Sequence, residues 1–298
     1  MGDSDLDVVA SGFSFLEGPR WHDGRLWVSD FYTHRVVAVS AQGEVETVAE
    51  VPQQPSGLGW LPDGRMLAVS MRDRRLLRRE DSGRLVEHAD LSQLASWHLN
   101  DMVVDAAGRA YVGNFGFDLM GGAPMRPANI VRVDPDSTAT VVAEDMLFPN
   151  GMAITPDGAT LIAAESFGQR LTAFDVDGDG SLRNRREWAR FGAVPETDDL
   201  NEALAGITLV PDGMCLDTEG AVWVADAIGH RVVRVRDGEI VDEVSAGDLG
   251  VFACMLGGDD GRTLFLCTAP SFAEHERRDT REAVLLSATV QVPHAGLP

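Results

Sequence analysis

The chain repeats one short pattern six times, and this repetition constrains its fold more than any other feature. In each copy, alternating apolar residues lead into a turn that ends in glycine, and a second apolar run follows. The segment "DGMCLDTEGAVWVAD" is one example. In five copies the turn glycine lies eight residues after the start, and in the first copy seven. The copies start at Glu17, Ser56, Asn100, Asn150, Asp212 and Ala253.

Each copy predicts a β-hairpin followed by a further strand. Asp-Gly or Glu-Gly between alternating runs is a strong hairpin signal, because glycine adopts the positive φ that such turns need. The starts are 39 to 62 residues apart, close to the length of one four-stranded propeller blade. Helical apolar spacing is nearly absent. We therefore predict an all-β, six-bladed β-propeller, since a β-sandwich does not explain six copies in register.

The two ends of the chain are expected to complete one blade together. The sixth repeat leaves room for only two or three strands, while the N-terminal "LDVVASGFSF" is a strand without a blade. We expect residues 7–14 to pair with residues 283–292, which closes the ring and covers its exposed edges. No linker interrupts the sequence, so residues 1–298 are predicted to form a single domain.

Charge and cysteine content exclude several classes of function. The formal net charge is −22, which disfavours binding to nucleic acid or to an anionic membrane surface. Three cysteines do not make a disulfide framework, and they favour a reducing compartment. The N-terminus lacks the features of a signal peptide, and no stretch is long enough for a transmembrane helix. We expect a cytoplasmic protein.

The first residues of the repeats are candidates for a ring around the central channel. Each begins the innermost strand of a blade, and five of the six are polar. Buried carboxylates cost several kcal/mol when unpaired, but together with amide oxygens they suit a hard divalent cation. Turn formation explains Asn, Asp and Ser at such positions equally well, but it does not explain Glu17. Asp30 and Asp226, which end "WVSD" and "WVAD", are expected to bond loop backbone, although Asp30 could lean toward the channel.

Several motifs carry a resemblance to a known family. "LEGPRW", "NDMVVDAAGR", "FPNGMAI", "NRREWA" and "PDGMCLDTEGAVWVAD" are similar, in this order, to motifs of the senescence-marker-protein, gluconolactonase and luciferin-regenerating-enzyme family. The resemblance covers nearly the whole chain. It implies a six-bladed propeller that holds one divalent cation and hydrolyses lactones. It places metal ligands on Glu17, Asn150 and Asp212, and substrate contacts on Asn100, Asp101 and Asp118.

The sequence departs from the sugar-lactone members of this family in one place. Animal members carry an arginine two residues before the Asn that matches Asn100, whereas this chain has His98. The surrounding loops are apolar, which favours a substrate less polar than a sugar lactone; simple packing of the loops explains the same residues equally well. The apolar residues expected at the mouth are Trp97, Phe115, Phe117, Met120 and Met125.

The leading hypothesis is a metal-dependent hydrolase that acts on a lactone or related cyclic ester. Asp212 or Asp101 would serve as general base, while Asn100 and His98 would orient the substrate. Oxygen ligands favour Ca²⁺, with Zn²⁺, Mn²⁺ and Mg²⁺ as alternatives. Two other classes stay open: a propeller synthase or lyase that uses His98 as acid or base on a larger metabolite, and a binding scaffold.

Overall fold

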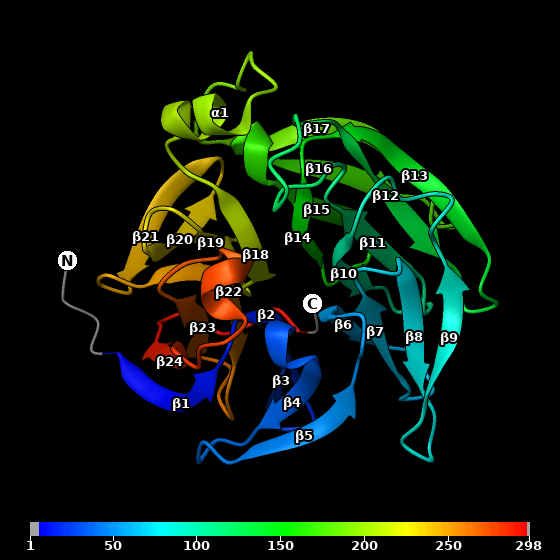
Figure 1. Cartoon of the computed structure of the whole chain (residues 1–298), viewed down its shortest axis with the longest axis vertical. Helices are drawn as coiled ribbons and strands as arrows, with labels where there is room; N and C mark the ends of the chain where they lie inside the picture. The colour runs from blue at the N-terminus through cyan, green and yellow to red at the C-terminus, as the bar shows by residue number, and fades with distance from the viewer. Residues whose placement is uncertain (1–5, 297–298) are drawn as a thin grey trace.

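Six four-stranded antiparallel sheets surround a central axis (Figure 1). The computed structural model describes residues 6–296. In five sheets the spatial order of the strands follows their order along the chain, from β2–β5 to β18–β21. The prediction of an all-β, six-bladed β-propeller is confirmed.

In five blades the innermost strand starts one residue before a repeat start, and in the last blade three residues before it; each blade runs outward from this strand. The strands of the first three blades are β2 (Leu16–His22), β3 (Arg25–Asp30), β4 (Arg35–Val39), β5 (Val45–Glu50), β6 (Pro55–Trp60), β7 (Met66–Ser70), β8 (Arg75–Arg79), β9 (Leu85–Asp90), β10 (Leu99–Val104), β11 (Ala110–Asn114), β12 (Ala128–Val133) and β13 (Ala139–Met146). Those of the other three are β14 (Pro149–Ile154), β15 (Thr160–Glu165), β16 (Arg170–Val176), β17 (Leu182–Arg190), β18 (Pro211–Leu216), β19 (Val222–Asp226), β20 (Arg231–Arg236), β21 (Glu239–Ser245), β22 (Gly250–Gly257), β23 (Thr263–Ala269), β24 (Ala283–Thr289) and β1 (Asp7–Phe13).

The last blade is shared between the two ends of the chain. Its order is β1-β24-β23-β22, and β1 pairs antiparallel with β24, from Asp7 opposite Ser287 to Phe13 opposite Ala283. The predicted closure of the ring by the N-terminal strand is confirmed. The prediction of one domain over residues 1–298 stays a prediction; residues 1–5 and 297–298 lie outside the described residues.

Turn glycines and close strand packing explain why the repeats fold in this way. All six turn glycines have φ between 71° and 86°, the left-handed region that the hairpin signal predicted. The inner strands pack closely around the axis. A Cβ atom at Gly151 in β14 would lie only 2.5 Å from the carbonyl oxygen of Asp212 in β18. Glycine therefore lets neighbouring inner strands approach one another.

The few helices lie in loops between strands. They are α1 (Leu200–Gly206), α2 (Glu274–Arg277) and the 3-10 turns η1 (Phe31–Thr33) and η2 (Ser166–Gly168). The carboxylate of Asp199 caps α1 by accepting a hydrogen bond from the backbone N–H of Glu202, at 2.9 Å. Within the described part of the chain, every helix is too short or too polar to span a membrane.

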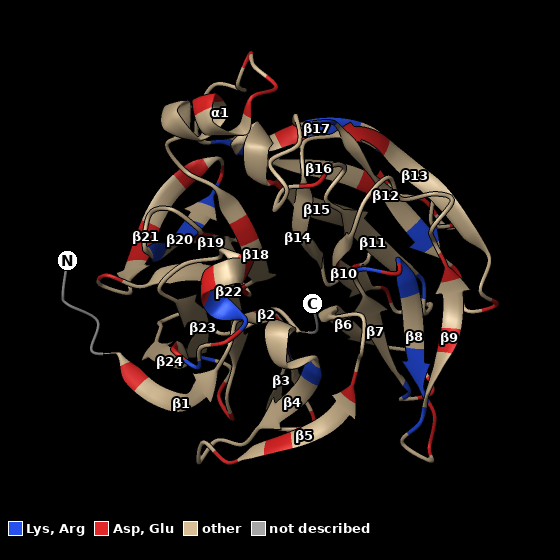
Figure 2. Ribbon diagram, viewed as in Figure 1, with Lys and Arg blue, Asp and Glu red and all other residues tan. Residues whose placement is uncertain are grey.

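Charged residues lie mainly on the outer strands and connecting loops (Figure 2). A conspicuous group of arginines lies on β8, beside acidic residues of the same blade. Arg75 is 3.2 Å from Glu87 and Arg78 is 2.7 Å from Glu80. These arginines thus pair with carboxylates of their own blade.

Candidate functional site

The channel opens into a cavity at the end where the inner strands begin. Its volume is about 100 Å³, several times the roughly 10–15 Å³ that one water molecule requires. Four of the six predicted ring residues line it, and all four are buried. The remaining two, Ser56 and Ala253, are also buried but are not part of the described lining. The four lining residues are Glu17, Asn100, Asn150 and Asp212.

A β-bulge presents these side chains to the cavity. In β14, Pro149 pairs with Glu165 and Met152 with Ala163, so two residues, Asn150 and Gly151, face a single residue of β15. The same irregularity occurs in β18 at Asp212, in β10 at Asn100 and just after Glu17 in β2. An extra residue re-aims a side chain that regular pleating would send elsewhere.

Glu17 and Asp212 are two acidic side chains buried at the same cavity. Burial raises the pKa of both carboxyl groups well above their ordinary values, and their mutual repulsion raises that of Glu17 further. Oδ1 of Asp212 has no hydrogen-bond partner among the described residues. Glu17 accepts one hydrogen bond, from the backbone N–H of Gly18 at 3.2 Å. In the described part of the chain neither carboxyl group forms an ion pair, and the charge of Arg20 opposes the rise in the pKa of Glu17 without overcoming it.

The amide of Asn150 is held in one orientation by Ser166. Its Nδ2 donates to Ser166 Oγ at 3.3 Å, and Ser166 Oγ donates to the carbonyl oxygen of Pro211 at 2.8 Å. This turns the amide oxygen of Asn150 away from Ser166. Asn100 lies on the same ring, where its Nδ2 donates to the carbonyl oxygen of Pro149 at 3.4 Å.

These residues fit a divalent cation in their chemistry. A cation would satisfy the unpartnered Oδ1 of Asp212 and neutralise the buried pair, and oxygen donors are those that Ca²⁺ and Mg²⁺ prefer. Within residues 6–296, no group of three or more His, Cys, Asp or Glu side chains is placed to hold a metal. The predicted ligand set of Glu17, Asn150 and Asp212 contains two carboxylates and one amide, so water would have to complete it.

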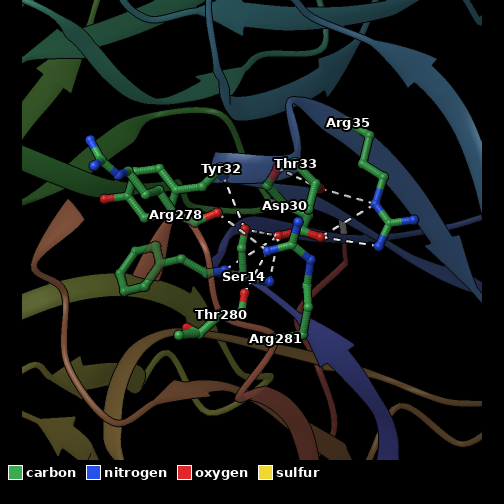
Figure 3. Close-up of polar contacts among 9 residues, drawn as sticks. Ser14, Asp30, Tyr32, Thr33, Arg35, Arg278, Thr280 and Arg281 are labelled. Atoms are coloured by element: carbon green, nitrogen blue, oxygen red, sulfur yellow. Dashed lines mark hydrogen bonds and ion pairs between the residues drawn. The ribbon is translucent and has the colours of Figure 1, made fainter. Parts of the chain in front are cut away.

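A buried acid anchors the loop that leads into each of these three residues. In blade 1, Asp30 accepts hydrogen bonds from the backbone N–H groups of Ser14 at 2.9 Å and Phe15 at 3.3 Å, and also from the Ser14 hydroxyl (Figure 3). Its other oxygen is 3.2 Å from Nη2 of Arg35 (Figure 3). Asp30 thus bonds loop backbone, as the sequence predicted, and does not line the cavity.

Blades 4 and 5 repeat this arrangement. Glu165 accepts from the backbone N–H of Leu147 at 2.8 Å and pairs with Arg170 at 2.9 Å. Asp226 accepts from the N–H of Val210 at 3.2 Å and pairs with Arg231 at 3.2 Å. The three acids, Asp30, Glu165 and Asp226, have fully buried side chains. Each of these acids is the last residue of the second strand of its blade. In the three blades that supply no proposed ligand, this position holds Ser70, Asn114 and Ala269.

Asp101 occupies a different environment from its neighbour Asn100. It stands where four other repeats have glycine, and its Oδ1 accepts from Arg20 Nη2 at 2.8 Å and from the backbone N–H of Met102 at 2.8 Å. Burial raises its pKa, while Arg20 opposes this. Arg20, which the sequence did not single out, lines a hollow of about 580 Å³ that Trp21 and Trp60, near the far ends of inner strands, also line. Asp101 is not part of the described cavity lining.

His98 and Asp118 lie outside the lining that the structure describes. The ring of His98 stacks on Trp97, with centroids 5.2 Å apart, and burial lowers its pKa. Asp118 accepts from the N–H of Gly121 at 2.8 Å. Their role as substrate contacts stays a prediction. Of the apolar residues expected at the mouth, Phe115 and Met120 line the cavity, whereas Phe117 and Met125 line a neighbouring hollow of about 570 Å³.

Comparison with known proteins shows the family to which this chain belongs. The model of the SMP-30/Gluconolactonase/LRE-like region matches residues 15–270, and the chain belongs to this family. It is 29% identical over 274 residues to the pentonolactonase XacC of Haloferax volcanii, covering 88% of this chain and 84% of that protein. It is 22% identical to the gluconolactonase of Zymomonas mobilis, covering 88% and 78%.

Solved structures confirm the fold. The calcium-binding protein regucalcin from Agrobacterium tumefaciens superposes with a TM-score of 0.79 at 20% identity, over 99% of this chain and 97% of that one. Because the identity is low, this likeness supports the six-bladed architecture alone.

Proposed function

We propose that this protein is a metal-dependent hydrolase of lactones. The observation that carries the proposal is the pair of buried carboxylates, Glu17 and Asp212, which line the cavity beside two amides. Family membership and the lactonase names of two relatives support it. The apolar lining favours a ring less polar than that of a sugar lactone.

Different residues would bind the metal, orient the substrate and transfer the proton. A divalent cation, Ca²⁺ by preference, would be held by Glu17, Asn150 and Asp212, and when bound it would polarise the ester carbonyl and acidify water. Asn100 would orient the substrate from the same ring. Water adds to the carbonyl carbon, the ring C–O bond breaks, and the product is a hydroxy acid. Asp212 would accept the proton from water and return one to the leaving oxygen.

Asp212 is a better candidate for this base than Asp101. The carboxylate of Asp212 lines the cavity, and its Oδ1 lacks a hydrogen-bond partner among the described residues. The Asp101 carboxylate is instead bound to Arg20, which keeps it turned away from the described lining. Proton transfer requires hydrogen-bond reach as well as a suitable pKa.

The three cysteines, all buried and free, are consistent with a reducing compartment, and we place the protein in the cytoplasm.

The first test combines metal titration with the substitution Asp212→Asn. Lactone hydrolysis by the wild-type protein should disappear on chelation and return with Ca²⁺, Zn²⁺, Mn²⁺ or Mg²⁺. Asp212→Asn keeps one coordinating oxygen but removes the basic site. Its kcat should fall by more than the ~10²–10⁴-fold that loss of a general base costs, even at metal concentrations that saturate binding in calorimetry.

Two outcomes would change this assignment. Full recovery of Asp212→Asn activity in excess metal would make Asp212 a ligand only. Wild-type hydrolysis that survives complete removal of metal would refute the metal-dependent mechanism.

A further inference from the structure

The cavity is apolar except at the ring residues, Ser166 and the hydroxyl of Tyr32. Seven of the twelve phenylalanines of the chain line it, together with Tyr32. A lactone whose ester group meets Glu17, Asn150 and Asp212 would therefore have the rest of its surface against aromatic rings. The phenylalanines are Phe15, Phe31, Phe115, Phe148, Phe167, Phe252 and Phe272.

The lining disfavours charged and polyhydroxylated substrates. Among the described residues the lining contains no arginine, and the sequence contains no lysine. The only charged side chains that an anionic substituent would meet are therefore the carboxylates of Glu17 and Asp212, which would repel it. Sugar hydroxyls need partners when buried, since an unpaired hydroxyl is costly. Apart from the ring residues, the lining offers Tyr32 and Ser166, and the Ser166 hydroxyl already donates to the Pro211 carbonyl.

The rim of the cavity is also apolar. Met120, Ile228 and Phe272 line it, and they are 44%, 38% and 40% exposed. They come from three different loops, which follow β11, β19 and β23. Solvent-exposed apolar side chains that converge on one opening are typical of a binding site.

One wall of the cavity is held in place by a strained residue. Phe148 has φ 62°, a conformation that bulky side chains rarely adopt, and it lies two residues before Asn150. Its ring packs against those of Phe115 and Phe167, with centroids 4.5 and 5.0 Å apart. Strain that the surroundings enforce at a cavity wall is typical of a functional site.

We propose that the substrates are neutral lactones with an alkyl or aryl substituent. The substituent lies between the wall around Phe148 and the rim formed by Met120, Ile228 and Phe272. This assignment rests on the proposed lactonase function, and it names the class of substrate for that same site.

A homologous series of γ-lactones tests the substrate class. Unsubstituted, butyl-, hexyl- and phenyl-substituted γ-butyrolactones are compared with glucono-1,5-lactone at saturating metal. Burial of each added methylene should raise kcat/KM by about two- to fourfold until the cavity is filled. The hexyl and phenyl compounds should exceed glucono-1,5-lactone by at least about 100-fold. A series without this gain, or a preference for the sugar lactone, would overturn the assignment.

A matched pair of isoleucines tests where the substituent lies. Ile228→Ser removes an apolar group from the rim, whereas Ile240→Ser removes a similarly exposed one, 44% exposed, on β21 outside the lining. Ile228→Ser should reduce the gain per methylene, and Ile240→Ser should keep the wild-type gain. Equal effects from the two variants would contradict the proposed position.

Binding of the corresponding lactams separates this inference from the proposed function. A 5-hexyl-pyrrolidin-2-one has no ester to hydrolyse, so calorimetry reports the cavity alone. Tighter binding of the hexyl lactam than of the unsubstituted lactam, weakened in Ile228→Ser, supports the assignment even if no lactone is hydrolysed. Hydrolysis of every lactone at similar rates, with no preference among lactams, would leave the lactonase function standing and refute the substrate class.

Discussion

At the scale of single residues, the three buried acids Asp30, Glu165 and Asp226 are linked to the proposed metal ligands through backbone. Each accepts hydrogen bonds from the segment two or three residues before a ligand. Hydrogen bonds from Arg170, Thr172 and Leu147 outweigh the effect of burial on Glu165 and lower its pKa, so it stays ionised. These acids would act as positioning residues, because they would orient the proposed ligands without touching the cation.

The substitution Asp226→Asn should weaken metal binding more than it weakens the fold. The amide can no longer form an ion pair with Arg231, and the backbone N–H of Val210 loses its carboxylate acceptor. We expect the Kd for Ca²⁺ in calorimetry to rise by about 10–100-fold. Asn114→Ala is the control, because Asn114 holds the matching position of a blade without a proposed ligand. It should lower the Tm and keep the Kd. A purely structural role would give both variants the same unchanged Kd.

The sequence predicted which polar residues of the inner strands line the cavity, and it missed other contacts for a physical reason; the roles of these residues stay predictions. The positions of Glu17, Asn150 and Asp212 could be predicted because the repeat itself places them at the start of the inner strands. The contact between Arg20 and Asp101 joins residues 81 positions apart on different blades, and no local pattern encodes it. The aromatic wall likewise gathers phenylalanines from several loops, whose packing depends on the closed ring. The sequence thus located the polar ring and only part of its apolar surroundings.

At the scale of structural elements, the inner strands are fixed by close backbone contact. In four repeats the glycine that follows the ring residue marks both the bulge and the contact with the next blade. In the third repeat Asp101 replaces that glycine, and its carboxylate is turned toward Arg20. The repeat predicted the blades and the turns, but it did not show which inner positions require glycine, since that depends on spacing between blades.

The substitution Gly151→Ala should destabilise the protein. Its new Cβ would approach the Asp212 carbonyl oxygen to 2.5 Å and Cα of Gly213 to 2.8 Å, and these backbone atoms cannot move without shifting β18. We expect a loss of about 1–3 kcal/mol in the free energy of unfolding. Gly206→Ala, at the end of α1, is the control, because open space surrounds that position. Its free energy of unfolding, measured by denaturant titration in the presence of chelator, should equal or slightly exceed that of wild type. Similar losses at both sites would contradict this account of the strand contact.

At the scale of the whole molecule, the ring depends on β1 docking against β24. The two strands pair over five positions, and Phe13 at the end of β1 is 1% exposed whereas Val8 is 67% exposed. Phe13→Ala should cost about 3–5 kcal/mol, because it removes a large buried side chain at the closure. Val8→Ala on the same strand should stay within about 0.5 kcal/mol of wild type. If thermal denaturation shows equal, small effects, β1 does not stabilise the ring.

The stability of the whole ring should also fall in mild acid, and His88 in β9 allows this to be measured away from the cavity. Burial lowers the pKa of His88, and the positive charges of Arg78 and Arg65 lower it further. Its Nδ1 lies 3.2 Å from Arg78 Nη1, so a proton on the folded imidazole would face a cation.

In the unfolded chain the pKa of His88 returns to about 6.5. Above that value both states are neutral and the contribution to stability is complete. As the pH falls through 6.5 toward the lower folded pKa, only the unfolded chain gains the proton, and stability is lost. In chelator, the drop in Tm from pH 7.5 to pH 5.5 should therefore be larger for wild type than for His88→Gln. An identical drop in both proteins would show that His88 is not responsible.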